Sequence, residues 1–220
     1  MCILRMLNLS LLAIGVCVAL ASPALAQTLR TLYRFTGGAD GSNSYGGLIA
    51  DAEGNLYGTT AWGGSSYCES GLGCGTVFKL DRAGKETVVY SFTGGTDGAT
   101  PYAGLIRDAE GNLYGTTAYG GSSNYGTVFR LDATGKQTVL HSFNGADGAG
   151  VYAGLIRDAE RNLYGTTFSG GPNGTGIVFS LTPLLNFGGT RTEAVLYAFP
   201  ESHGDPQAGV APTFGSATNK

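Results

Sequence analysis

The chain has 220 residues, a net charge of −3 and 13% charged side chains, a low charged share for a soluble domain. This composition offers no basic surface for nucleic acid or for an anionic membrane, so neither partner is expected. Glycine accounts for 38 residues, but these glycines recur at fixed places in a repeat, which is not typical of low-complexity disorder.

Residues 1–26 have the features of a secretory signal peptide. Arg5 precedes an apolar run from Leu7 to Ala21, and Ala-Leu-Ala at 24–26 fits the small-x-small cleavage pattern. A membrane anchor is the alternative, but about 15 apolar residues are few for a membrane span. We therefore expect a secreted or cell-envelope protein, periplasmic or extracellular, with no membrane span after cleavage.

A ten-residue sequence recurs three times in the rest of the chain. DAEGNLYGTT at 51–60 returns at 108–117, and DAERNLYGTT follows at 158–167. Without insertions the period is about 50 residues, which suits a four-stranded propeller blade or a comparable β unit.

Each unit contains four short apolar or β-prone runs separated by Gly, Asn, Asp and Ser, which is the pattern of strands and turns. In the second unit these runs are YAGLIRDA, NLYGTTA, GTVFRLD and QTVLHSF. No sustained helical period is present outside the signal. The sequence predicts an all-β, propeller-like tandem repeat of four-stranded antiparallel blades within residues 27–214, with units at about 36–92, 93–143 and 144–199.

The repeated ten residues predict a tight hairpin, DAEGN, followed by the strand LYGTT. A glycine at the same strand position in each unit indicates a crowded place where another group approaches closely. These glycines are Gly58, Gly115 and Gly165. Apolar residues on both faces of the strands, such as Val88 and Val89, indicate sheets covered on both sides.

Both ends of the repeat region are partial units. TLRTLYRF at 28–35 matches the last strand of a unit, and a fourth unit begins within 200–214, before a tail at 215–220. Closed propellers have about four to eight blades, so we expect an open arc or part of a larger ring. Its uncovered end blades would favour self-association. A twisted, incomplete barrel-like sheet is the alternative.

These units, with GLIRDAEGNLYGTT, GTVF and TVL-x-SF in a fixed order, resemble the GloVer tandem-repeat family of exported bacterial proteins. The similarity covers nearly all of the chain after the signal. The resemblance implies a secreted or surface-displayed protein of tandem β units, often tethered by a C-terminal anchor, and brings no catalytic residues with it. Here the repeats are few and no anchor is recognisable.

Two cysteines, Cys68 and Cys74, remain after signal cleavage, and both lie in an insertion of the first unit. In an oxidising compartment a close pair is expected to form a disulfide. Half of a metal site is the alternative, but the mature sequence supplies no further cysteine as a partner.

Three acidic turns recur, with Asp40, Asp97 and Asp147, and Asp205 lies in a degenerate fourth. Carboxylates repeated on one rim are candidate calcium ligands. Each loop, however, supplies a single Asp in an Asp-Gly turn, so turn chemistry is the favoured interpretation. No other cofactor is expected.

Aromatic residues follow the repeated Thr pair in each unit, at Trp62, Tyr119 and Phe168. Aromatic rings in loops stack on sugars or anchor protein partners, so these three are the candidate ligand-binding residues. Packing against the glycine-rich turn is the alternative.

No catalytic residue is identified. His141 aligns with tyrosines at an aromatic packing position, and the serines lack a nucleophile-elbow context. We expect a non-enzymatic exported protein that binds carbohydrate or protein at the cell surface. A propeller-type hydrolase or lyase with a central site and an inactive fragment are the alternatives, and nearly identical blades favour repeated binding over one asymmetric site.

Overall fold

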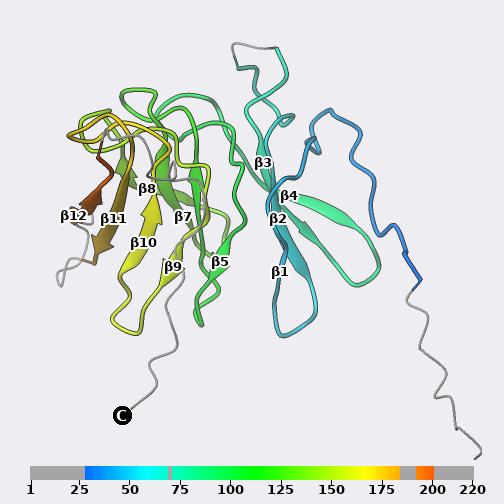
Figure 1. Ribbon diagram of the computed structural model, residues 1–220. Coiled ribbons are helices and arrows are strands. Elements are labelled where there is room, and N and C mark those ends of the chain that lie inside the picture. Colours follow the sequence, from blue (N-terminus) through cyan, green and yellow to red (C-terminus); the bar gives the residue numbers. More distant parts are fainter. Residues whose placement is uncertain (1–27, 69–70, 184–191, 201–220) are drawn as a thin grey trace, which may run out of the picture. The chain divides into compact units, whose positions relative to one another are not determined.

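The computed structural model describes residues 28–68, 71–183 and 192–200, and all of its strands lie in the part from Leu32 onward. They form three four-stranded antiparallel sheets, each made of consecutive strands (Figure 1). The first sheet contains β1 (Ile49–Ala50), β2 (Leu56–Thr60), β3 (Thr76–Leu80) and β4 (Glu86–Ser91). The second contains β5 (Ile106–Arg107), β6 (Leu113–Thr117), β7 (Thr127–Leu131) and β8 (Gln137–Ser142). The third contains β9 (Ile156–Arg157), β10 (Leu163–Thr166), β11 (Ile177–Thr182) and β12 (Thr192–Ala198).

The predicted all-β tandem repeat is therefore confirmed. The sheets follow one another along the chain and, within the described residues, do not close into a ring. The same residues contain no helix that is long and apolar enough to cross a membrane. The predicted signal peptide and the partial fourth unit with its tail lie outside the described residues.

The DAEGN segment is the expected hairpin in all three units. In the first, the amide of Asp51 donates to the carbonyl of Asn55, and Gly54 adopts a φ of 80°. The third unit carries Arg161 at this place, with a φ of 71°. Only glycine adopts such a φ without steric cost, so the arginine adds local strain.

The first strand of each unit is much shorter than the predicted eight-residue run, and tertiary contacts explain the difference. Residues 102–105 leave the second sheet and pack against the matching segment of the first. A Cβ on Gly46 would lie only 2.5 Å from the amide nitrogen of Gly104. Thr59 of β2 donates a buried hydrogen bond of 2.8 Å to the carbonyl of Ala103. The segment therefore joins two sheets instead of extending one.

The repeated strand glycines occupy the crowded place that the sequence predicts. Gly115 of β6 pairs with Phe129 of β7, and an added Cβ would lie 2.6 Å from the tip of that ring. The same distance is 2.7 Å between Gly58 and Phe78 and 2.5 Å between Gly165 and Phe179. In each sheet the absence of a side chain makes room for a phenylalanine ring.

These phenylalanines also join neighbouring sheets. Phe92, which follows β4, packs edge-on against Phe129 at 5.1 Å, and Phe143, which follows β8, packs against Phe179 at 5.2 Å. All four rings are fully buried. Phe35, from the partial unit before the first sheet, contacts Phe78 at 4.9 Å in the same manner. A ring at the end of each unit thus fills the core of the next.

The last strand presents apolar side chains that are better covered in the other sheets. Val195, Leu196 and Tyr197 of β12 are 40%, 55% and 50% exposed, whereas the matching residues of β4 and β8 are half-buried. An end blade that no neighbouring blade covers is expected to expose apolar side chains in this way. Self-association through it stays a prediction.

Candidate functional site

A row of aromatic side chains crosses the three sheets. Tyr45, Tyr102 and Tyr152 occupy the same place in their units, a few residues before the first strand. The ring of Tyr102 lies 5.4 Å from that of Tyr45 and 5.3 Å from that of Tyr152. The rings come this close because the glycine segments beside them are in backbone contact.

The three aromatic residues that the sequence singles out join this row. Trp62 lies 6.1 Å from Tyr45, while Tyr119 and Phe168 lie 6.5 Å and 5.6 Å from Tyr152. We call these six residues the aromatic row. Sequence reasoning missed its three linking tyrosines because they stand in runs that read as strands. Their recurrence before the Gly-Leu-Ile motif is the signal that could have identified them.

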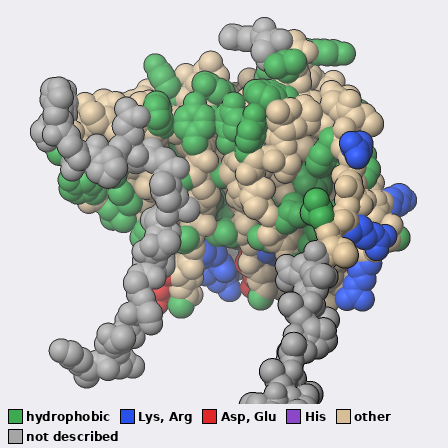
Figure 2. All heavy atoms as spheres, turned by 45° about the vertical axis from the view of Figure 1, so that its right-hand side comes forward, with side chains coloured by type: hydrophobic (Ala, Val, Ile, Leu, Met, Phe, Trp, Pro, Cys, Tyr) green, Lys and Arg blue, Asp and Glu red, His purple; other side chains and the backbone are tan. Residues whose placement is uncertain are grey.

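The aromatic row is accessible to a ligand. Tyr45, Tyr119 and Phe168 are 59%, 44% and 43% exposed. The loops that follow β2, β6 and β10 lie at the upper end of the sheets in Figure 1, and hydrophobic side chains gather at that end in Figure 2. An exposed group of rings of this kind is a feature of binding surfaces rather than of an ordinary soluble surface.

Tyr102 and Tyr152 keep their hydroxyl protons at neutral pH, because the pKa of each is raised. Burial and then a hydrogen bond with Tyr119 raise the pKa of Tyr152, and the two hydroxyl oxygens lie 3.0 Å apart. Burial, followed by the nearby Tyr119 and Tyr45, raises the pKa of Tyr102. The row therefore offers flat apolar faces and neutral hydroxyl groups, without charge.

A pocket of about 510 Å³ lies beside the row, between the first and second sheets. Trp62, Tyr102 and Tyr119 of the row line it together with Tyr67, and Thr93 and Asn124 supply polar groups. Its volume falls within the range of about 300–1,000 Å³ that is usual for small-molecule sites. Among the described residues, the lining contains no acidic, basic or histidine side chain, so these residues offer uncharged hydrogen-bonding groups and apolar surface.

The insertion of the first unit forms one wall of this pocket. Cys68 and Cys74 form the expected disulfide, with their Cα atoms 5.2 Å apart. Cys74 is fully buried, and Cys68 lines the pocket. A Cβ on Gly94 would lie 2.5 Å from the sulfur of Cys68, so the absence of a side chain lets the loop sit against the β4–β5 turn.

The acidic turns have a structural role in the described residues. Asp97 accepts hydrogen bonds from the hydroxyl of Tyr90 at 2.9 Å and from the amide of Thr93 at 2.8 Å. Asp40 has the same partners in Tyr33 and Thr36. Burial alone would raise the pKa of Asp40, but the hydrogen bonds from Thr36 and then Tyr33 outweigh it and lower this pKa.

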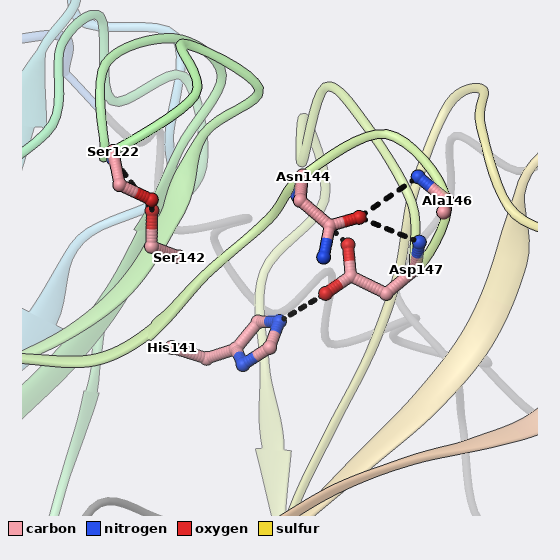
Figure 3. Close-up of polar contacts among 6 residues, drawn as sticks. All are labelled: Ser122, His141, Ser142, Asn144, Ala146 and Asp147. Atoms are coloured by element: carbon pink, nitrogen blue, oxygen red, sulfur yellow. Dashed lines mark hydrogen bonds and ion pairs between the residues drawn. The ribbon is translucent and has the colours of Figure 1, made fainter.

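The third acidic turn is one residue shorter than the other two and differs at two of its bracing positions. Its Asp147 pairs with the Nε2 atom of His141 at 3.0 Å, where the other turns use a tyrosine (Figure 3). The amide of Asn144 donates to the second carboxylate oxygen at 2.8 Å. Among the described residues, no group of three acidic, histidine or cysteine side chains could hold a metal ion. The carboxylates of Asp40, Asp97 and Asp147 each brace their own turn, and calcium binding stays untested. Asp205 lies outside the described residues.

The acidic side chains of the repeated hairpins are also used locally. Asp51 accepts hydrogen bonds from the backbone and side-chain nitrogens of Asn55, at 2.8 and 2.7 Å, and from the hydroxyl of Tyr57. Burial acts to raise its pKa, but these hydrogen bonds prevail and lower it to about 2. Asp108 and Asp158 repeat the arrangement. These carboxylates are hairpin braces that stay ionised at neutral pH.

A comparison of the same strand position in two units predicts a stabilising substitution. Gln137 of β8 donates its side-chain amide to the carbonyl of Asp97 at 3.0 Å. Its counterpart in β4 is Glu86, whose Oε1 atom is buried without a hydrogen-bond partner. Burial and then the nearby Asp40 raise the pKa of Glu86. We expect Glu86→Gln to raise the free energy of unfolding by about 1 kcal/mol at pH 7, because it supplies the missing donor.

Chemical denaturation across pH checks this prediction. A raised pKa favours the protonated carboxyl, so the wild type should approach the Glu86→Gln variant as the pH falls to about 4. The reciprocal change, Gln137→Glu, is the matched control and should lower stability at pH 7. Equal stability of Glu86→Gln and the wild type at every pH would contradict the assignment.

The fold defines a tandem β-repeat protein, and the aromatic row is an exposed feature that its three sheets share. The family model described as the Gloeobacter/Verrucomicrobia repeat matches residues 15–217, and the chain belongs to this family. The resemblance drawn from the repeated motifs is thereby confirmed.

Other comparisons add little. No protein in the curated set matches the sequence. A solved structure of a candidate gluconolactonase is similar over 73% of this chain, with 18% identity and a TM-score of 0.35. The chain spans 48% of that protein. So distant a likeness carries no argument about activity.

Proposed function

We propose that this protein is an exported, non-catalytic binder of neutral carbohydrate chains. The observation that carries the proposal is the aromatic row, in which six rings are linked by ring contacts across three sheets. Five of them stand at repeated positions, and Phe168 lies one position earlier than Trp62 and Tyr119 do in their units. Aromatic faces pack well against apolar C–H surfaces, and tyrosine also presents a polar hydroxyl. A surface whose rings recur from unit to unit suits a ligand that is itself a chain of repeating units.

The chemistry of the surface favours a sugar over a protein partner. Protein interfaces draw much of their affinity from arginine together with buried aromatic anchors. The described lining of the pocket beside the row instead offers the side chains of Thr93, Thr100 and Asn124, all of which are uncharged. Neutral hydroxyl and amide groups are suited to the hydroxyl groups of an uncharged sugar.

Affinity electrophoresis of the purified chain against soluble polysaccharides tests the proposal. We expect retardation by neutral polysaccharides such as xyloglucan, galactomannan or β-glucan, and none by polygalacturonate. Trp62→Ala and Tyr119→Ala should each weaken binding about tenfold or more, because aromatic hot spots typically contribute about 2 kcal/mol. Binding should be constant between about pH 5 and pH 9, since the row contains no carboxyl, imidazole or amine group.

Tyr197→Ala is the matched control. This tyrosine of β12 is 50% exposed but lies outside the aromatic row, so its loss should leave binding unchanged. A protein that ignores every neutral polysaccharide, or row variants that bind as the wild type does, would overturn the proposal. Capture of a protein partner through the same rings would favour the alternative.

A further inference from the structure

The pocket stands to one side of the tyrosine line rather than on it. Of the three linking tyrosines, only Tyr102 lines the pocket. Tyr45 and Tyr152 lie on either side of Tyr102 in the row. A chain that follows the row therefore passes the mouth of the pocket at Tyr102. Trp62 and Tyr119 belong to both the row and the pocket lining.

Among the three units that the structure describes, the first alone carries the insertion whose Tyr67 and Cys68 form the outer wall of the pocket. In the first unit the segment YCESGLGC separates the Gly-Gly pair from β3, whereas the second unit has Asn124 and Tyr125 at the corresponding place. The insertion contributes Tyr67, which is 86% exposed, and Cys68. The row is thus a repeated feature, and the walled pocket is a feature of the junction between the first and second sheets.

We propose that this pocket receives a neutral sugar side group of a polysaccharide whose main chain lies along the aromatic row. The inference rests on the proposed function and adds a preference for branched over linear polysaccharides. The three linking tyrosines, which repeat from unit to unit, contact the main chain, while the pocket selects chains that carry a side group. The disulfide between Cys68 and Cys74 holds the selecting wall in place, and Gly94 allows its close approach.

Matched pairs of polysaccharides test the inference, because each pair shares a main chain and differs in its side groups. Galactomannan is compared with linear mannan, and xyloglucan with linear β-1,4-glucan oligosaccharides, by isothermal titration calorimetry. The wild type should bind the branched member of at least one pair about tenfold more tightly. Tyr67→Ala should remove most of this preference and keep the affinity for the linear member.

A second variant, Cys68→Ser with Cys74→Ser, removes the covalent closure of the wall. It too should lose the preference, and circular dichroism at the wild-type value would show that the sheets are retained. Tyr125→Ala, in the corresponding short loop of the second unit, is the control and should keep the preference.

The outcomes separate the two proposals. Binding of both members of each pair with equal affinity, or a preference that survives in Tyr67→Ala and in the cysteine variant, would overturn the pocket inference and leave the row proposal intact. If neither branched nor linear polysaccharide binds, the proposed function itself fails.

Discussion

Replacement of Gly115 by alanine is expected to lower the free energy of unfolding by about 2–3 kcal/mol. The new methyl group would lie 2.6 Å from the tip of the Phe129 ring and 2.8 Å from a methyl group of Leu105. Both neighbours are buried, so neither can turn into solvent. Relief of the overlap requires the strand or the ring to move inside a close-packed core. Urea denaturation of the two proteins measures the difference.

Gly47→Ala is the matched control for this substitution. Nothing lies within 4 Å of a Cβ built at Gly47, and its φ is not positive. Its stability should stay within about 0.5 kcal/mol of the wild type. Shortening the facing ring with Phe129→Leu should partly rescue Gly115→Ala, so that the double variant is more stable than the sum of the two changes predicts. A Gly115→Ala variant as stable as Gly47→Ala would show that the glycine position is not crowded.

Replacement of Phe143 by alanine is expected to cost more, about 4 kcal/mol of unfolding free energy. This ring is fully buried and packs against Phe179 of the third sheet at 5.2 Å and against His141 at 4.6 Å. Its loss leaves a cavity between two sheets rather than within one. We therefore expect the third sheet to unfold before the others, which hydrogen exchange followed by mass spectrometry would detect.

Phe199 is the matched position at the end of the third unit. Its ring is half-buried and contacts Tyr197 of its own strand at 5.1 Å. Phe199→Ala should cost about 1 kcal/mol, because less apolar surface is exposed on unfolding. Equal losses for Phe143→Ala and Phe199→Ala would show that the ring at the end of a unit gains nothing from the following sheet.

The repeated sequence has a consequence for function. Most side chains that brace a turn or a hairpin recur in the same place, and so do the three linking tyrosines of the aromatic row. Hydrogen bonds such as that between Tyr90 and Asp97 hold the acidic groups within their own turns. These carboxylates are therefore engaged within the fold.

The sequence alone determines the type of fold and the number of its units. The alternation of short β-prone runs with glycine-rich turns predicts four strands per unit, and the copies of NLYGTT mark the three sheets. The crowded glycines are also predictable, because glycine is costly inside a strand and its recurrence there needs a local reason. The disulfide is predictable because two reactive cysteines stand close together in the sequence. These features depend on neighbours that are close in the sequence.

Only the tertiary structure shows which aromatic residues lie together. Tyr102 and Tyr152 stand 50 positions apart by their numbers, yet their rings are 5.3 Å from one another. Likewise, the first strand of the second unit is short because residues 102–105 pack against the first sheet, where Thr59 donates to the carbonyl of Ala103. Contacts between sheets depend on how one unit is placed on the next, and the period of a single strand holds no information about that placement.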